Sequence, residues 1–239
     1  MENKTILTVN NISASYGNVQ ALWDISFSVE KGEIFALIGS NGAGKSTLLK
    51  TLTGLLRPTT GDAEFLGKRI DRLPPYKIVE MGISHIPEGG RLFPDMSVQE
   101  NLQMGAYNSR VWKQQKETLS QVYEIFPVLK ERQNQLARTL SGGEKQMLAV
   151  GRGLMSKPIF CMFDEPSYGL SPKYVAEVFN VIKSLRERGI TILLVEQNVR
   201  RTLEIADRAC VIENGRVGLA GTCQMLLANE HIKKAYLGL

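Results

Sequence analysis

The segment Gly39–Ser46 has the residue types and spacing most able to do chemistry, because Gly-Ser-Asn-Gly-Ala-Gly-Lys-Ser fits the pattern G-x-x-x-x-G-K-[ST]. Its glycines allow successive backbone N–H groups to turn toward one point, where phosphate oxygens would bind. Lys45 would reach the β- and γ-phosphates of a nucleotide, and Ser46 would be a ligand of Mg²⁺. The simpler interpretation is a glycine-rich turn with a solvated lysine. The predicted phosphate-binding residues are Gly39, Ser40, Asn41, Gly42, Ala43, Gly44, Lys45, Ser46 and Thr47.

Two adjacent carboxylates, Asp164 and Glu165, directly follow the apolar run Ile159–Phe163. Carboxylates at the end of a buried strand are costly unless they are paired or bind a metal. Asp164 would hold Mg²⁺, directly or through water. Glu165 would face another way, since neighbouring strand residues alternate, and could take a proton from an attacking water as a general base. The alternative is an Asp-Glu pair that caps the following segment.

A third candidate is the segment Leu140-Ser141-Gly142-Gly143-Glu144, which precedes a stretch of helical apolar spacing. Bare N–H groups at a helix start would make a second phosphate site. One chain does not need two such sites for one nucleotide. A helix N-cap followed by a capping glutamate would explain Ser141 and Glu144 but not the two glycines.

The glycine-rich segment and the Asp164-Glu165 pair can act together only if the strands before them end at the same edge of one sheet. The continuous apolar runs 34–38, 159–163 and 190–195 are typical of strands covered on both faces. Leucines at helical spacing over 48–56 predict a helix after the glycine-rich turn, ending at Arg57-Pro58. Strands that alternate with helices indicate a parallel α/β sheet.

Three other stretches differ from this alternating pattern. Apolar and polar residues alternate over 25–29, which predicts a half-exposed, antiparallel strand. Helical periodicity prevails over about 92–155, so we expect a helical lobe inserted into the core. Asn214-Gly215, between two apolar runs, predicts a β-hairpin.

Composition excludes several classes of protein. The chain has 239 residues, of which 43% are hydrophobic, so disorder is not expected. No apolar run approaches the roughly 18–20 residues that cross a bilayer, and the first residues lack an apolar signal core. Three scattered cysteines (Cys161, Cys210 and Cys223) argue against a disulfide scaffold or zinc site. The net charge is +5, but the Lys and Arg residues form no continuous basic block. This favours an ordinary solvated surface of mixed charge, on a protein inside the cell.

Together, these motifs resemble the ATP-binding cassette (ABC) ATPases, over almost the whole chain. The resemblance implies a P-loop NTPase core of the α/β class with a mostly parallel sheet, an antiparallel β subdomain near the N-terminus and a helical insert subdomain. It also implies one domain, residues 1–239. In this domain the nucleotide-binding core comprises 1–90 and 156–239, and the helical signature subdomain comprises about 91–155.

The resemblance also implies roles for individual residues. In that family the segment equivalent to Leu140–Glu144 closes over ATP held by a second subunit, and two copies pack head to tail. Ser141, Gly142, Gly143 and Glu144 would therefore contact the partner's nucleotide. Tyr16 resembles the aromatic residue that stacks on adenine, the alternative being a packed hairpin tyrosine. ATP and Mg²⁺ are the implied cofactors, and closure would drive a membrane partner.

Three positions depart from the usual family pattern. Glu88 stands where a glutamine normally contacts Mg²⁺, and a carboxylate could still serve this hard cation. Gln197 stands where a histidine normally touches the γ-phosphate; it can donate a hydrogen bond but cannot become cationic. Ser171 replaces an aspartate. Lys45, Glu165 and Gln197 are thus the predicted catalytic residues, with Ser46, Glu88 and Asp164 as the predicted metal ligands.

Several short motifs narrow the resemblance to the shorter ATPase subunit of bacterial high-affinity branched-chain amino-acid importers. They are Tyr16-Gly17, Gln20-Ala21-Leu22, Pro87-Glu88, Arg91-Leu92-Phe93-Pro94, Val98-Gln99-Glu100-Asn101-Leu102 and Val195-Glu196-Gln197-Asn198. The implied partners are a second ABC ATPase subunit, identical or different, integral membrane permeases and, indirectly, a solute-binding receptor. No nucleic acid is expected, and the chain would be cytoplasmic, peripheral on the inner face of the membrane.

Other functions stay open at this point. Importers of urea, amides or other amino acids have similar ATPases. In a different class, a soluble ABC protein could act on ribosomes or DNA. Such proteins usually carry two cassettes or a long coiled coil, whereas this chain has one cassette. A nucleotide-dependent regulator without turnover is the third possibility.

Overall fold

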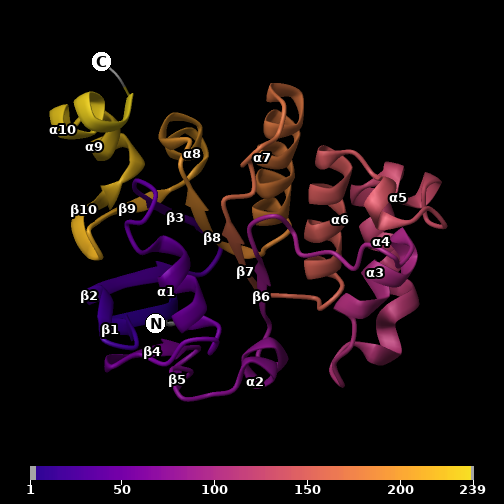
Figure 1. Ribbon diagram of the computed structural model, residues 1–239, viewed down its shortest axis with the longest axis horizontal. Helices are drawn as coiled ribbons and strands as arrows, with labels where there is room; N and C mark the ends of the chain where they lie inside the picture. Colours follow the sequence, from indigo (N-terminus) through magenta and orange to yellow (C-terminus); the bar gives the residue numbers. More distant parts are fainter. Residues whose placement is uncertain (1–3, 238–239) are drawn as a thin grey trace. The chain divides into compact units, whose positions relative to one another are not determined.

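The computed structural model describes residues 4–237, which divide into two compact units. The first unit runs from the N-terminal residues to Ile78 and resumes at Thr191. The second unit is the intervening segment Val79–Ile190. Each unit contributes part of the predicted chemistry, so each is described on its own (Figure 1).

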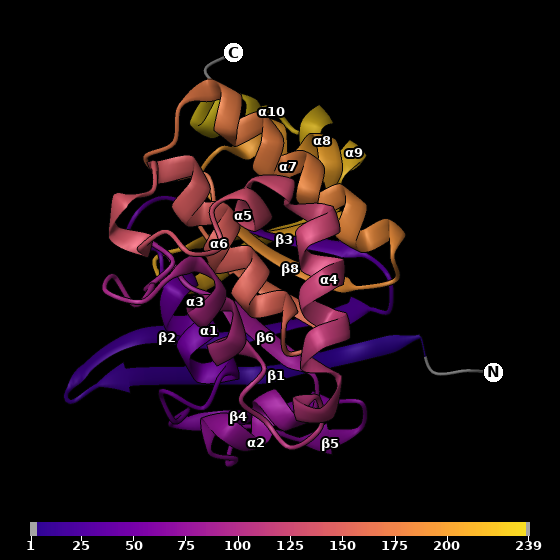
Figure 2. The ribbon, with the colours of Figure 1, turned by 90° about the vertical axis from the view of Figure 1, so that its right-hand side faces the viewer.

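The first unit contains an antiparallel sheet with the strand order β2-β1-β4-β5. Figure 2 shows its two long strands, β1 and β2, side by side. Ile25 and Val29 are buried while Ser26 is exposed, so the alternation in β2 is that of a half-buried antiparallel strand, as predicted. The strands are β1 (Thr5–Tyr16), β2 (Val19–Glu30), β4 (Thr60–Phe65) and β5 (Lys68–Arg69).

The same unit contains parallel strands that are buried on both faces. β3 pairs in parallel with β8 and with β9, and β10 pairs antiparallel to β9. The β9–β10 turn has Asn214 at φ 50° and Gly215 at φ 75°, so the predicted hairpin is confirmed with a turn whose two central residues are left-handed. The parallel strands are β3 (Ile34–Ile38), β8 (Thr191–Glu196) and β9 (Arg208–Glu213), and the partly exposed antiparallel strand is β10 (Arg216–Thr222).

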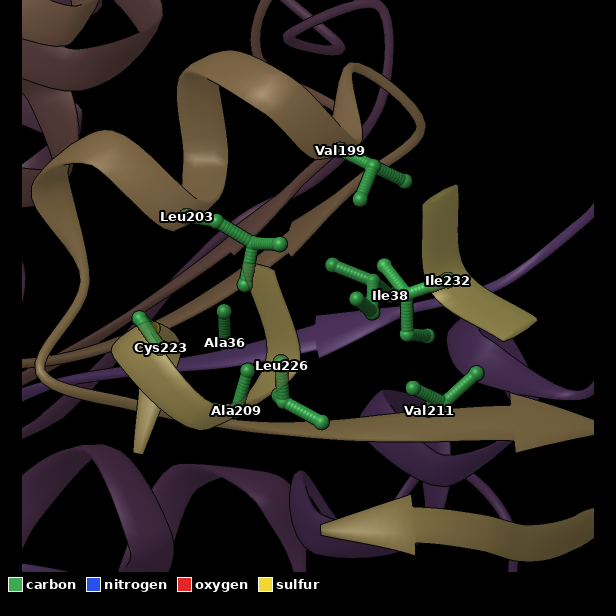
Figure 3. Packing of buried hydrophobic residues seen from close by; sticks show 9 residues of the cluster. All are labelled: Ala36, Ile38, Val199, Leu203, Ala209, Val211, Cys223, Leu226 and Ile232. Atoms are coloured by element: carbon green, nitrogen blue, oxygen red, sulfur yellow. The ribbon is translucent and has the colours of Figure 1, made fainter. Parts of the chain in front are cut away.

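One face of these strands is covered by the helices of the C-terminal third. Figure 3 shows side chains of α8, α9 and α10 packed over β3 and β9, in a cluster that includes Ile38, Val211 and Ile232. Removing this apolar surface from water stabilises the unit by about 25 cal/mol per Å² buried. The helices are α8 (Val199–Ile205), α9 (Cys223–Ala228), α10 (Glu230–Ile232) and the π-helical turn η3 (Lys233–Leu237).

The helix after the glycine-rich turn is shorter than predicted. α1 spans Lys45–Leu52 instead of continuing to residue 56. Gly54 ends it, because this residue adopts a left-handed φ of 73° and the N–H groups of Gly54 and Leu55 donate to the carbonyls of Thr51 (3.2 Å) and Lys50 (2.9 Å), the pattern of a Schellman C-cap. The leucine spacing did not reveal this stop. A further short helix, α2 (Pro75–Glu80), follows β5.

The second unit joins two parallel strands to a group of helices. β6 (Ile83–Ile86) pairs with β7 (Phe160–Asp164), and the segment between them is helical, as its periodicity predicted. Pro127 begins a new helix, which separates α4 from α5. The helices are α3 (Val98–Gly105), η1 (Trp112–Gln114), α4 (Gln115–Ile125), α5 (Pro127–Glu131), η2 (Ala137–Thr139), α6 (Gly142–Leu154) and α7 (Pro172–Glu187).

Within residues 4–237, no helix combines the length and the apolar composition needed to span a membrane.

Candidate functional site

The glycine-rich loop joins the buried strand β3 to helix α1. Gly42 and Gly44 adopt φ values of 79° and 107°, which favour glycine over residues with a side chain. Lys45 is 4% exposed, and its Nζ donates to the carbonyl oxygens of Gly39 (2.8 Å) and Ser40 (3.0 Å). The ammonium group therefore curls back over the loop, where it can exchange these carbonyls for phosphate oxygens.

The start of α1 is suited to bind an anion. Its N-cap is Gly44, which has no side chain to accept from the first N–H groups, and its first turn contains no acidic residue. The positive end of the helix dipole therefore favours an anion at this end of the helix. Ser46 and Thr47 lie in this turn, as their predicted roles require.

Tyr16 is the last residue of β1 and belongs to the same unit as the loop. Its side chain is 46% exposed, and Lys50 Nζ lies 5.5 Å from the centre of its ring. Its hydroxyl accepts a hydrogen bond of 3.3 Å from Lys50 Nζ of α1. The half-exposed ring is therefore held beside the phosphate-loop helix, in a position that suits the predicted stacking on adenine.

Gln197 directly follows β8, the parallel neighbour of β3. Ile38 is the register partner of Glu196, so Gln197 and Gly39 leave the same edge of the sheet. The Glu196 carboxylate is buried and accepts from the backbone N–H groups of Gln197 (3.1 Å) and Asn198 (3.4 Å). Glu196 thereby orients the bend that exposes Gln197, a positioning contact that the sequence did not reveal.

The two predicted acidic residues lie at the end of β7, whose five residues are all buried. Asp164 is the last of them, and Glu165 follows at φ 48°, a left-handed conformation that is uncommon for a residue with a long side chain. Such backbone strain clusters at functional sites. Because Ile86 of β6 is the register partner of Phe163, Glu88 emerges at the same edge of this strand pair as the two carboxylates.

The predicted metal ligands suit Mg²⁺ bound together with phosphate. Among residues 4–237, no group of three His, Cys, Asp or Glu side chains forms a metal site of its own. Mg²⁺ in phosphate sites usually takes one or two protein oxygens and completes its shell with phosphate and water. Ser46 of the first unit offers a hydroxyl oxygen, and Asp164 and Glu88 of the second unit each offer a carboxylate, the kinds of oxygen that this cation prefers; their joint role as ligands stays a prediction.

Ser141 is the N-cap of α6 and forms a capping box with Glu144. The Ser141 N–H donates to Glu144 Oε2 (2.8 Å), and the Glu144 N–H donates to Ser141 Oγ (3.4 Å). Arg132 Nε lies 2.9 Å from the other carboxylate oxygen of Glu144. These contacts make Glu144 a residue that fixes the helix start, and its predicted contact with a nucleotide stays a prediction.

The two glycines of this segment have different environments. A Cβ on Gly143 would collide with the ring of Tyr174, so this glycine is required by packing within the unit. A Cβ on Gly142 would meet only Leu170 Cδ2 at 3.9 Å, which is ordinary contact. Gly142 and Ser141 are exposed. Packing therefore does not explain Gly142, which is consistent with a helix start kept open for a ligand.

Arg152 of α6 anchors the loop that carries Glu88. Its guanidinium donates to the carbonyls of Gly90 (2.5 Å) and Arg91 (2.9 Å) and lies 5.6 Å from the ring centre of Phe93. Partial burial lowers the pKa of Arg152. No motif in the sequence pointed to this residue, because its partners are backbone carbonyls about sixty positions away.

His85 of β6 makes stability depend on pH. Its Nε2 is buried and has no hydrogen-bond partner among the described residues, and desolvation lowers its pKa to about 4. The unfolded chain binds this proton near pH 6.5, so stability is lost as the pH falls from 6.5 toward 4. We expect the free energy of unfolding to decrease by about 2 kcal/mol between pH 7.5 and 5 through this group.

Urea unfolding of His85→Gln at these two pH values tests this expectation. The variant should lose most of that pH dependence. His231→Gln removes the other histidine, whose side chain is 58% exposed, and serves as the comparison for losing a histidine at the surface. Equal slopes in wild type and His85→Gln would contradict the prediction.

The fold and the loop define the class of protein, a P-loop ATPase. Residues 22–168 match the ABC transporter family. The chain belongs to this family, and it is an ATPase of the ATP-binding cassette type.

Individual relatives match over nearly the full length. The branched-chain amino-acid transport ATP-binding protein BraG of Pseudomonas aeruginosa is 47% identical over 98% of this chain and 100% of its own length. The lipopolysaccharide export ATP-binding protein LptB of Haemophilus influenzae is 34% identical over 98% of both chains. The ADP-bound structure of MJ1267, an ATP-binding cassette of an ABC transporter, has a TM-score of 0.87 at 28% identity, covering 99% of this chain and 100% of that one.

Proposed function

We propose that this chain is the ATP-hydrolysing subunit of an importer that takes up branched-chain amino acids through separate membrane permeases. The observation that carries this proposal is the 47% identity to BraG from end to end. The similarity to LptB, a lipopolysaccharide export protein, is lower. Importers of urea, amides or other amino acids remain the alternatives for the solute.

In the proposed reaction, the glycine-rich loop and the start of α1 bind the phosphates of ATP, and Lys45 donates to the β- and γ-phosphates. Ser46, Asp164 and Glu88 would hold Mg²⁺, which would neutralise phosphate charge. Glu165 accepts a proton from the attacking water as its oxygen bonds to the γ-phosphorus. The bond between this phosphorus and the bridging oxygen breaks, giving ADP and phosphate, while Gln197 donates to the γ-phosphate.

The proposed assembly is a head-to-tail pair of cassettes attached to permeases on the cytoplasmic face of the membrane. Ser141 and Gly142 of one subunit would contact the nucleotide held by the other, through the open start of α6. A second ATPase, identical or different, completes the pair, and a solute receptor acts through the permeases. Nucleic acid is not expected among the partners.

Affinity purification of a trapped complex tests this proposal. Tagged Glu165→Gln would be produced in the native cell, and membranes would be solubilised with ATP and Mg²⁺. We expect to recover two permeases, a second cassette ATPase and an amino-acid-binding receptor. Lys45→Ala combined with Glu165→Gln is the control, since it should not hold ATP and should lose the nucleotide-dependent part of the recovery.

Other partners would overturn the proposal in distinct ways. Components of a lipopolysaccharide export system would favour the exporter, and a different receptor would change the solute. Ribosomes, DNA-repair proteins or the absence of any membrane protein would remove the transport function while leaving a cassette ATPase.

A further inference from the structure

The turn between β9 and β10 contacts the phosphate loop through its backbone. The N–H of Gly215 donates to the carbonyl of Ala43 at 2.9 Å. The carbonyl of Gly215 accepts from the N–H of Trp23 in β2 at 2.8 Å. One residue of the turn therefore connects the loop to a strand of the antiparallel sheet, all within the first unit.

Both ends of the phosphate loop are packed without room for a side chain. A Cβ on Gly39 would collide with the carbonyl oxygen of Ile212 in β9. A Cβ on Gly44 would lie 2.7 Å from Leu22 Cδ2 and 3.1 Å from the carbonyl oxygen of Ala21. The loop, the turn and β2 thus meet backbone against backbone, and a shift in one must move the others.

The strands beneath this contact are fixed by the apolar cluster of Figure 3. Ile38 and Val211 are register partners in β3 and β9, and each immediately precedes a residue of the contact, Gly39 and Ile212. Both side chains belong to the cluster, together with Ile232 of α10. The turn therefore extends from β9, a strand that is close-packed against β3 and the helices and has little freedom to move.

Gly215 itself is required both by conformation and by space. Its φ of 75° is left-handed. A Cβ there would collide with the carbonyl oxygen of Ala21 and would lie 3.0 Å from Trp23 Cδ1. A side chain at this position would therefore push the turn away from β2 and strain the bond to Ala43.

We propose that the β9–β10 turn is a positioning element for the phosphate loop, and that Gly215 is its positioning residue. By holding the Ala43 carbonyl, the turn fixes the backbone of the loop, in which the Ala43 N–H donates to the Ser40 carbonyl (3.2 Å), before a nucleotide arrives. A loop whose backbone is fixed in advance binds phosphate at a smaller cost of reorganisation. This inference rests on the proposed binding of nucleotide by the loop, to which it adds a determinant more than 170 residues away in the chain.

The test compares Gly215→Ala with two glycine variants of the same unit. Gly67 has nearly the same φ, 73°, but a Cβ there meets nothing within 4 Å, so Gly67→Ala reproduces the backbone strain alone. Gly221 of β10 would meet nothing closer than 3.8 Å, so Gly221→Ala controls for a change in the same strand. Titration with a fluorescent ADP measures the affinity of each full-length variant.

We expect Gly215→Ala to weaken ADP binding about tenfold and to raise the KM for ATP by a similar factor. Amide hydrogen exchange in residues 40–45 of the nucleotide-free chain should become faster, which a general loss of stability would not confine to this loop. The two control variants should keep the wild-type affinity.

A second variant covers the case in which Gly215→Ala does not fold. Arg216 is exposed, and its guanidinium lies 4.9 Å from the ring centre of Trp23, so Arg216→Ala loosens the turn from β2 without touching the core. It should weaken ADP binding two- to threefold, whereas Arg72→Ala, which removes the same charge from an exposed site, should not.

The outcomes separate the two proposals. If the wild type binds no nucleotide, the proposed function itself fails. If the wild type binds, but Arg216→Ala and a folded Gly215→Ala bind as tightly as their controls, the positioning role of the turn is wrong while nucleotide binding stands.

Discussion

Lys45→Ala is expected to weaken the binding of ATP about 100-fold. Lys45 is the one cation inside the glycine-rich loop, and it already donates to the carbonyls of Gly39 and Ser40. Charge-assisted hydrogen bonds are each worth about 1.5–3 kcal/mol, so losing those to two phosphates removes about 3 kcal/mol or more. Isothermal titration of the purified chain with ATP and Mg²⁺ measures the change.

The same substitution also removes a donor from two loop carbonyls, so stability must be measured beside affinity. A modest decrease in the melting temperature without nucleotide is compatible with the prediction. The titration is made below that temperature, where the variant is folded, so it reports the affinity of the folded chain. Lys183→Ala, on the exposed face of α7, removes an equal charge and should leave the affinity unchanged. Wild-type affinity in a folded Lys45→Ala would exclude the loop as the phosphate site.

The sequence predicted the elements whose signal is local. The glycine pattern of the phosphate loop, the continuous apolar strands and the Asn214-Gly215 turn all follow from steric rules that act within a few residues. The end of α1 was predicted less well, because the left-handed Gly54 stops the helix while the leucine spacing continues. A glycine C-cap overrides periodicity there.

The contacts that hold the site in place could not be read from the sequence. Glu196, Arg152 and Gly215 act on backbone N–H or carbonyl groups, and such partners leave no complementary residue type to detect. The left-handed backbone of Glu165 is likewise a property of the folded strand end. Glu144 has one contact of each kind. Its place three residues after Ser141 predicted the capping box, whereas nothing in the sequence predicted its ion pair with Arg132.

Glu165→Gln is expected to keep ATP binding while lowering turnover by a factor of about 10²–10⁴, the range typical of losing a general base. Glutamine has nearly the same shape, so the left-handed backbone after β7 and the bond from the Tyr168 N–H to the Glu165 carbonyl should persist. What is lost is the carboxylate that accepts the proton. Phosphate release at saturating ATP measures turnover, and titration with ATP measures binding in the same preparation.

Two comparisons give this result its meaning. Glu177→Gln, on an exposed position of α7, makes the same chemical change and should leave turnover unaffected. Under ATP, Glu165→Gln should also accumulate as a dimer by size-exclusion chromatography, because hydrolysis no longer opens it.

Unchanged turnover in Glu165→Gln would remove this residue from the role of base. Gln197 cannot replace it, since an amide does not accept a proton near neutral pH. A wild type that binds ATP but never turns over would instead favour a nucleotide-dependent regulator. Retained binding, lost turnover and a trapped dimer are therefore expected together. ATP binding closes the dimer without the Glu165 carboxylate, whereas the hydrolysis that reopens the dimer requires it.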